Sequence, residues 1–373
     1  MKCKVTYLIG SAKHFYAKDV IFIAKGMYLL YICNMKRSTL IGLILLAFVA
    51  ACRFFVPVAE FYADFCYPFI QTVLSLVSCI FPFSLEEITV LFFAFLFIRI
   101  IWVAIKRRRG FLYWLKSTAL TVMWLVIWFY MGWGNNYFRT PLYERAGVER
   151  RHFDHEEFCR FVADYTDELN RTAGAAVRTD RKGLEKDINS FYRQEPNDLG
   201  YTKLHKWQRT KRVLLHPLYS WVSVLGYMGP FWCESQLNPD LLDNEYPSTL
   251  AHEKAHLAGV TSEAEANYWA YVYCSQSDDE GVRYSGYLHL FPFVAINARS
   301  LFTEQEYDEW IASVSPTVIN DYRQNREFWQ NKRVRLLDDI QYRMMDTMLK
   351  SNSVSQGADD YIGVIGMIIT MQR

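Results

Sequence analysis

Three apolar segments, each near the length needed to cross a lipid bilayer, lie in the first third of the chain. They cover residues 39–58, 85–105 and 117–133, the last being short. A helix rises ~1.5 Å per residue and the hydrocarbon core is ~30 Å thick, so a span needs about 20 residues. Because lipid offers no partners to free backbone groups, such segments must be helical. The sequence therefore predicts a membrane protein with an N-terminal bundle of three transmembrane helices.

The rest of the chain is more polar and long enough for a separate domain. Residues 139–212 and 298–360 are rich in Arg, Asp, Glu, Lys and Asn. We therefore divide the chain into a transmembrane region, 35–134, and a water-facing domain, 135–373. The 41 basic and 39 acidic residues leave a net charge of only +2. This balance offers no basic field for nucleic acid, so the lipid bilayer is the predicted partner and nucleic acid is not.

The first 34 residues do not have the layout of a cleaved signal peptide. The sequence restarts at Met35, where two basic residues precede the first apolar run. That order is typical of an uncleaved signal anchor. We expect translation to begin at Met35 and residues 1–34 to be a mis-assigned or disordered extension. The alternative is a partly apolar arm on the membrane surface.

The charges beside the spans predict their orientation. Basic residues occur at 36–37 and 106–109, whereas the loop after the first span contains Glu60 and Asp64. Basic loops stay in the cytoplasm. Three spans that start inside end outside. We therefore expect a multi-pass protein of the cytoplasmic (inner) membrane whose C-terminal domain, from residue 135, is extracytoplasmic.

Three further segments affect this arrangement. Residues 60–84 are aromatic and punctuated by proline, which indicates an interfacial or re-entrant helix. Residues 213–232 are apolar enough for a fourth span, which would return the domain to the cytoplasm. Their prolines and glycines favour a core or interfacial helix instead. The charged stretch 321–350 is expected to form a solvated outer helix.

The strongest chemical signal is TLAHEKAHLAGVTSEAEANYWAYVYC, at residues 249–274. It contains the pattern HExxH as His252, Glu253 and His256. Positions i and i+4 of a helix share a face, so both imidazoles can bind one Zn²⁺, and Glu253 can reach the water that the metal acidifies. The alternative is a pair of surface histidines without a metal.

The residues around this motif favour two consecutive helices. Pro247 suits the start of the first helix and Gly259 its end, while Ser262 can cap the second. A catalytic zinc needs a third protein ligand. We predict Glu263 for this role, with Glu265 in reserve. The alternative is that both acids only stabilise the helix dipole.

Two weaker candidates for the site lie on either side of the motif. Tyr284 could donate a hydrogen bond to a developing oxyanion, as could Arg283 or His289, although packing of Tyr284 on the motif helix is the alternative. Residues 229–239 could form an edge strand that pairs with a bound peptide, or a plain loop.

The eight cysteines show neither a CxxC pair nor zinc-finger spacing. They do not indicate a disulfide framework. Cys159, Cys233 and Cys274 lie in the polar part, where buried free thiols are favoured. A bridge between Cys233 and Cys274 is the alternative if this part faces an oxidising compartment.

From about residue 38 to its end, the chain resembles a family of bacterial membrane proteins, the domain-of-unknown-function 3810 family. The similarity is carried, in this order, by EFYADFCYPF, FPFSLEEI, WGNNYFRTPL, GPFWCESQLN, LAHEKAHLAGVTSEAEANYWAY, RYSGYL, MDTMLKSN and DDYIGVIG. Through HExxH the family is similar to zinc metallopeptidases. The resemblance implies no known substrate.

The block from Glu263 to Asn267 also resembles the ExxAD of membrane-bound gluzincin peptidases, whose first Glu is a zinc ligand. Here Asn267 stands where those peptidases have Asp, and the block follows His256 much more closely. This departure puts the role of Asn267 in doubt more than that of Glu263.

The predicted fold is mainly α, with the three-helix membrane bundle followed by an α-rich, gluzincin-like zinc metallopeptidase domain. The predicted function is a membrane-anchored peptidase acting on an unknown envelope protein or peptide. His252, His256 and Glu263 would hold Zn²⁺, and Glu253 would be the general base. The alternative is a non-catalytic envelope scaffold or sensor with a metal-stabilised fold. The intact Glu253 favours the enzyme, because a structural site has no use for that acid.

Overall fold

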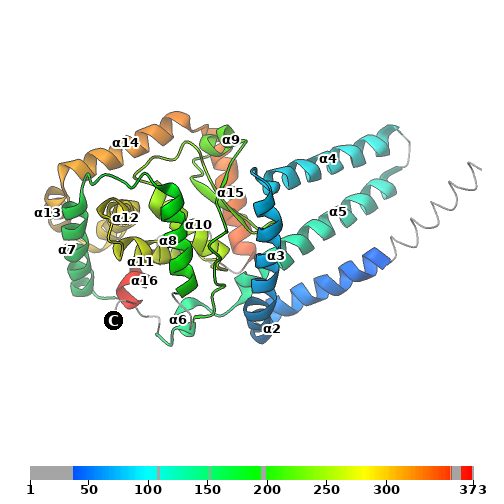
Figure 1. The fold of residues 1–373 in the computed structure, drawn as a ribbon, viewed down its shortest axis with the longest axis horizontal. Helices are drawn as coiled ribbons and strands as arrows, with labels where there is room; N and C mark the ends of the chain where they lie inside the picture. The colour runs from blue at the N-terminus through cyan, green and yellow to red at the C-terminus, as the bar shows by residue number, and fades with distance from the viewer. Residues whose placement is uncertain are drawn as a thin grey trace, which may run out of the picture.

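The protein has a set of long apolar helices joined to a mainly helical domain with one small sheet (Figure 1). The computed structural model describes residues 37–106, 110–149, 151, 153–194, 199–352, 354 and 363–371. The expected extension 1–34 and the expected start at Met35 lie outside the described residues. The mainly α fold class is confirmed.

Among the described residues, four helices are long and apolar enough to cross a membrane, one more than the sequence predicted. They are Arg37–Phe54, Val56–Ile80, α4 (Leu85–Lys106) and α5 (Gly110–Gly132). Within the second, α2 (Val56–Phe61) leads through a π-helical turn, η1 (Tyr62–Cys66), into α3 (Tyr67–Ile80). Helix α5 begins at Gly110 rather than at the predicted residue 117, because the apolar residues after Gly110 continue the helix. These helices indicate a membrane protein.

The additional candidate, α3, runs across the ends of α4 and α5 instead of beside them (Figure 1). One face of α3 packs on the domain: the Tyr67 hydroxyl donates to the Leu257 carbonyl at 2.8 Å, and Ser75 Oγ to the Cys233 carbonyl at 2.7 Å. The opposite face exposes a stripe of large apolar side chains, Phe69, Val73, Leu76 and Ile80. Helix α3 is therefore amphipathic.

The domain is built from helices of different lengths around a central pair. After a 3-10 turn, η2 (Gly134–Phe138), its helices are α6 (Leu142–Arg145), α7 (His155–Thr172), α8 (Arg181–Gln194), α9 (His216–Trp221), α10 (Tyr246–Leu257), α11 (Glu263–Ser275), α12 (Glu280–Leu301), α13 (Glu304–Ser313), α14 (Pro316–Lys332), α15 (Arg335–Ser351) and α16 (Val364–Met371). Helices α10 and α11 pack on each other, and α12 packs on both.

Helix α10 is buried along its whole length after Tyr246. A helix buried on all sides is usually apolar all round, whereas α10 carries His252, Glu253, Lys254 and His256. Burying these polar and charged groups costs free energy unless each has a hydrogen-bond or ion-pair partner. Lys254 finds one in Glu185, 2.9 Å away. The histidines and Glu253 form the site described below.

The sheet has three short strands in the order β1-β3-β2: β1 (Lys211–Arg212), β2 (Gly226–Gly229) and β3 (Glu234–Leu237). Strand β3 is parallel to β1 and antiparallel to β2. The prediction that residues 229–239 form an edge strand is wrong, because this segment contains the central strand. The edge strand that contacts α10 is β2.

The segment 213–232 does not form a membrane span. It contains the six-residue helix α9 and the strand β2. The prolines and glycines that argued against a span divide the segment, so the expected core or interfacial helix is present only as one short piece.

A buried polar network joins the start of α4 to the sheet. The Glu234 carboxylate on β3 accepts hydrogen bonds from Ser78 Oγ at 2.5 Å, Ser84 Oγ at 2.5 Å and the Glu86 backbone N–H at 2.9 Å. Next to it, the Glu87 carboxylate accepts the backbone N–H groups of Leu214 and Leu215, each at 2.8 Å. The membrane helices and the domain are therefore held together by directed bonds.

Cys233 and Cys274 are separate buried thiols. Cys233 Sγ lies 3.4 Å from the Gly132 carbonyl, whereas Cys274 packs against Gly286. The preferred reading as free thiols is confirmed for these two residues, and the alternative of a Cys233–Cys274 bridge is wrong.

Glu234→Ala should lower the stability of the protein. It leaves the donors of Ser78, Ser84 and Glu86 without their buried acceptor, which costs about 1–3 kcal/mol. Thermal unfolding of the detergent-solubilised protein should show the melting temperature falling by several degrees. Glu327→Ala, at an exposed position of α14, is the matched control and should change it little. Equal melting temperatures for both variants would contradict the role given to Glu234.

Candidate metal centre

A tight turn brings the start of α11 back onto α10. Gly259 has φ +101, and its N–H donates to the His256 carbonyl at 3.0 Å, while the Val260 N–H donates to the Ala255 carbonyl at 3.1 Å. This is a Schellman ending, which favours glycine at the left-handed position. Ser262 then caps α11 by accepting the Glu265 N–H at 3.2 Å. The predicted roles of Gly259 and Ser262 are confirmed, and Glu263 becomes the first residue of α11.

Three side-chain atoms converge between these helices. His252 Nε2 lies 3.1 Å from His256 Nε2, and Glu263 Oε2 lies 3.2 Å from the first and 3.4 Å from the second. Zinc binds imidazole nitrogen and carboxylate oxygen at ~2.0–2.2 Å in a tetrahedron, so two of its ligands lie roughly 3.3 Å apart. The three distances match one face of such a tetrahedron.

Hydrogen bonds on the far side of each imidazole determine which nitrogen faces the cluster as an acceptor. His256 Nδ1 lies 2.9 Å from the Val260 carbonyl oxygen, which can only accept. His252 Nδ1 lies 2.7 Å from Asn267 Oδ1, also an acceptor. In the neutral rings both protons therefore sit on Nδ1, and both Nε2 atoms present lone pairs. Glu263 Oε2 is buried, and apart from the two imidazoles no described group bonds to it. Three acceptors that face one another suit a cation.

Without a metal, the cluster retains a proton. Burial alone would lower the pKa of His256, but the adjacent Glu263 carboxylate outweighs it and raises the pKa to about 9. Burial would raise the pKa of Glu263, but the charge on His256 and hydrogen bonds from both histidines hold it well below its usual range. A divalent cation would displace this proton, as metals do when they bind histidine.

Glu253 lies beside the cluster on the same helix. Its carboxylate is buried, and Oε2 has no hydrogen-bond partner in the described residues. Burial raises its pKa to about 7, against the lowering effect of the two histidine charges. Strand β2 passes directly over it, because a Cβ added at Gly226 would lie 2.6 Å from Glu253 Oε1. Glycine at 226 therefore allows the strand and the acid to meet, a role that the sequence did not reveal.

Asn267 holds the first histidine in place. Its Oδ1 accepts from His252 Nδ1 at 2.7 Å and from His289 Nε2 at 2.9 Å. Burial and the nearby His252 lower the pKa of His289 to about 3, so His289 stays neutral and acts as a fixed donor. Such outer hydrogen bonds orient histidine ligands. The structure thus places Asn267, whose role the sequence left in doubt, beside the histidine cluster.

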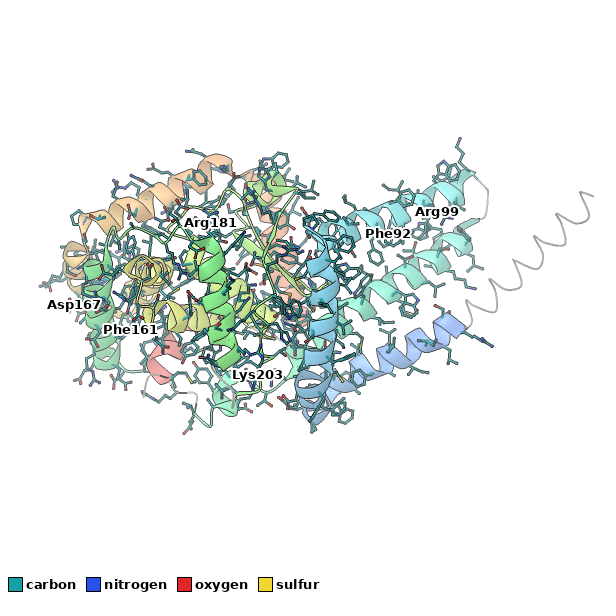
Figure 2. All side chains as sticks on the ribbon, in the orientation of Figure 1. Phe92, Arg99, Phe161, Asp167, Arg181 and Lys203 are labelled. Atoms are coloured by element: carbon teal, nitrogen blue, oxygen red, sulfur yellow. The ribbon has the colours of Figure 1, made fainter. Side chains whose placement is uncertain are left out.

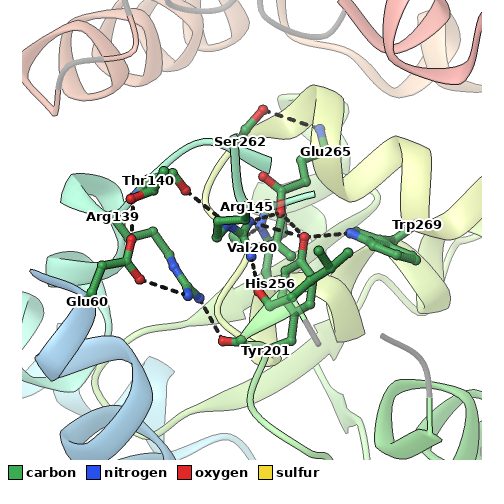
Figure 3. A network of polar contacts seen from close by, with 12 residues as sticks. Glu60, Arg139, Thr140, Arg145, Tyr201, His256, Val260, Ser262, Glu265 and Trp269 are labelled. Carbon is green, nitrogen blue, oxygen red and sulfur yellow. Dashed lines mark hydrogen bonds and ion pairs between the residues drawn. The ribbon is translucent and has the colours of Figure 1, made fainter. Parts of the chain in front are cut away.

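The reserve candidate, Glu265, is used elsewhere. Its Oε1 pairs with Arg145 Nη2 at 2.7 Å and also accepts from the Tyr201 hydroxyl, which in turn accepts from Trp269 Nε1 at 2.9 Å (Figure 3). Close by, Arg139 pairs with Glu60 of α2 at 3.2 Å. Of the two acids, the structure brings Glu263 to the histidines, and Glu265 instead fixes the start of α11.

Tyr284 is not brought to the cluster. Its ring is buried, and its hydroxyl donates to Asp321 Oδ2 on α14 at 2.6 Å. This bond directs the hydroxyl toward α14, so the catalytic role predicted for Tyr284 has no support in the geometry. Of the two other donors considered, Arg283 is held by Glu280 at 3.3 Å, and His289 bonds to Asn267.

Two residues from the region of the apolar helices contact the end of α10, the helix that carries the histidines. Trp133, immediately after α5, donates from Nε1 to the His256 carbonyl at 2.8 Å, and Tyr67 of α3 donates to the Leu257 carbonyl at 2.8 Å. Both carbonyls belong to the last turn of α10, where backbone acceptors lack helical partners. The cluster therefore lies close to the domain-side ends of the apolar helices.

The chain belongs to the family described as "Protein of unknown function (DUF3810)", whose model matches residues 62–369. No curated protein matches the chain. No solved structure matches it either.

Glu263→Gln and Glu265→Gln should separate the two acids. Loss of the Glu263 carboxylate removes one of three ligands, so the metal content of the purified protein should fall at least tenfold. Glu265→Gln should leave it nearly unchanged, because that side chain lies outside the cluster. Elemental analysis of the detergent-solubilised variants measures both. Metal lost from Glu265→Gln and kept by Glu263→Gln would reverse the assignment.

Proposed function

We propose that this family member is a membrane-anchored zinc peptidase, with Zn²⁺ held by His252, His256 and Glu263. The proposal rests on one observation: two imidazole lone pairs and a carboxylate oxygen meet at the distances of a tetrahedral face, with Glu253 beside them. The donor set of two His and one Glu is that of zinc peptidases with an open fourth position. Bound zinc would acidify a water molecule and polarise the substrate carbonyl.

The protein's own residues supply the proton transfers. Glu253, with a pKa raised by burial to about 7, can take a proton from the attacking water near neutral pH and return it to the leaving nitrogen. Asn267 and His289 keep His252 in one orientation during these steps. Gly226 keeps the strand above close enough to shield the acid from bulk water.

Strand β2 offers a place for an extended peptide. One of its edges pairs with β3, and no strand of the described chain pairs with the other edge. Peptides commonly add to such an edge through backbone hydrogen bonds. Because Gly226 of β2 lies against Glu253, a peptide on this edge would pass the reactive water. The edge proposed from the sequence at 229–239 is thus replaced by 226–229.

A non-catalytic scaffold or sensor is the second candidate. It is favoured by the low exposure of the cluster, since His252, Glu253 and His256 expose 9%, 5% and 8% of their surfaces. A metal enclosed to this degree suits a structural role. The buried carboxylate of Glu253, whose Oε2 has no partner in the described residues, favours the peptidase over the scaffold. A structural metal site would give that acid no function.

We also propose that three of the four apolar helices cross the membrane and that α3 lies on its surface. Helix α3 is hydrogen-bonded to the domain at Tyr67, Ser75 and Ser78, and a helix packed on a water-facing domain over this length cannot also cross the bilayer. Phe92 and Arg99 lie on the part of α4 that extends away from the domain (Figure 2). With basic residues at the far ends of the spans, the domain is extracytoplasmic and the membrane is the cytoplasmic one.

Topology reporters test the orientation. A reporter fused after Arg108 should be active only in the cytoplasm, and one fused after Gly134 only outside it. If α3 also crossed the membrane, both results would be reversed, since the number of crossings before each fusion would change by one. The paired fusions therefore distinguish three spans from four.

Glu253→Gln tests the chemistry. The substitution keeps the shape of the side chain and removes the base. Zinc content should stay near one per chain, while hydrolysis of a peptide library should fall about 10²- to 10⁴-fold. His252→Ala is the matched variant and should lose both zinc and activity. Full activity in Glu253→Gln would contradict the mechanism, and a zinc-loaded wild type that cleaves no peptide would favour the scaffold.

A further inference from the structure

Helix α15 is amphipathic, and in the described part of the chain its apolar face is exposed. Of its 17 residues only Leu349 is buried. The side chains of Leu336, Leu337, Ile340, Met344 and Met348 expose between 37% and 69% of their surfaces. At ~100° per residue these five positions fall within an arc of about 120°. This apolar face lies away from Leu349, the side on which the helix packs.

Both ends of α15 are bonded to elements at the ends of the membrane helices. At its C-terminus, Arg53 Nη1 donates to the Ser351 carbonyl and the Tyr130 hydroxyl to Asn352 Oδ1, both at 2.8 Å. Arg53 lies near the end of the helix Arg37–Phe54, and Tyr130 near the end of α5. The last turn of α15 is thus held where two candidate spans leave the bilayer.

The N-terminus of α15 is connected through α9 to the domain-side end of α4. The Val334 N–H donates to the Trp221 carbonyl at the end of α9, at 2.8 Å. The residues before α9, Leu214 and Leu215, are bonded to Glu87 in the first turn of α4. Helix α15 is ~25 Å long, and both of its ends are bonded to elements at the domain-side ends of the candidate spans. It therefore lies along the membrane surface. In the view of Figure 1 it runs in roughly the direction of α3, transverse to α4 and α5, and is drawn on the domain side of α3.

Helix α9 extends the apolar surface. Leu214, Leu215, Leu218 and Trp221 expose 60%, 39%, 48% and 39% of their surfaces. Together with the five apolar residues of α15 they form what we call the collar. An exposed apolar surface of this extent on a water-facing domain marks a binding site. Its continuity with the ends of the spans identifies the occupant as the bilayer that the spans cross.

We propose that the collar lies in the headgroup layer of that bilayer and holds the metal-binding domain flat on the membrane. Amphipathic helices bury an apolar face in this layer by ~5–10 Å. Trp133 and Tyr67 bond the end of α10 directly to the domain-side ends of the apolar helices. The collar would therefore hold the His252–His256–Glu263 cluster near the membrane surface, within reach of polypeptide segments that lie close to the lipid. The collar itself does not depend on the proposed peptidase activity.

Photo-cross-linking of the full chain in phospholipid nanodiscs tests the proposal. The probe p-benzoylphenylalanine is placed singly at Ile340 or Met344 on the apolar face and at Asp339 or Lys350 on the polar face of the same helix. Phe92, exposed on α4, is the positive control. Phospholipid adducts, counted by mass spectrometry, should form at Ile340 and Met344 at least fivefold more than at Asp339 and Lys350.

Two outcomes would overturn the proposal. One is equal adduct formation on the two faces, or none at Ile340 and Met344 while Phe92 reacts. The other is cross-linking of Ile340 and Met344 in native membranes to a second copy or to another protein instead of lipid. Two apolar-face positions are used so that a fault in folding at one of them, seen as a lowered melting temperature, leaves the other to decide.

Discussion

The rest of the site depends on three acceptor atoms whose lone pairs face one another in a buried space. The Nε2 atoms of His252 and His256 and Oε2 of Glu263 lie within 3.4 Å of one another. Such acceptors repel unless a proton or a metal ion lies between them. Hydrogen bonds to Asn267 and to the Val260 carbonyl prevent the neutral rings from turning a proton inward. The packing of α10, α11 and α12 thus maintains three acceptors that face one another, an arrangement that could hold a metal ion.

The same helix that carries the histidines is coupled to the membrane region. Trp133 and Tyr67 bond to its last turn, and Glu234 joins the neighbouring strand to the start of α4. Buried polar networks of this kind are rigid when every member has a partner. The His252–His256–Glu263 cluster is therefore built against the domain-side ends of the apolar helices.

Local signals made much of the site predictable from the sequence. The spacing of His252 and His256 is a property of one helix, and Gly259 and Ser262 mark the ends of two helices joined by a short turn. Glu263 follows from that turn alone. The sequence kept Glu265 in reserve, because Arg145 and Tyr201, which hold it away from the histidines, lie far away in the sequence. The interpretation of Tyr284 as an oxyanion donor lacks support for a similar reason. Its hydroxyl bonds to Asp321 on another helix, which the sequence around Tyr284 does not reveal.

The fold was predictable where hydrophobic length decides it. The apolar helices appear close to where the sequence placed them, but length and composition alone cannot separate α3 from a span. Its polar face, including Gln71 and Ser75, is buried against the domain, which is a tertiary property. The small sheet was not predicted, because strands of two to four residues show too little alternation of apolar and polar residues to reveal which strand is central.

X-ray absorption spectroscopy of the wild-type protein, purified in detergent without added chelator, tests the central claim most directly. We expect one zinc ion per chain, with four nitrogen or oxygen ligands at ~2.0–2.1 Å, two of them showing the scattering of imidazole rings. A protein without bound metal, or a zinc site with sulfur ligands, would contradict it.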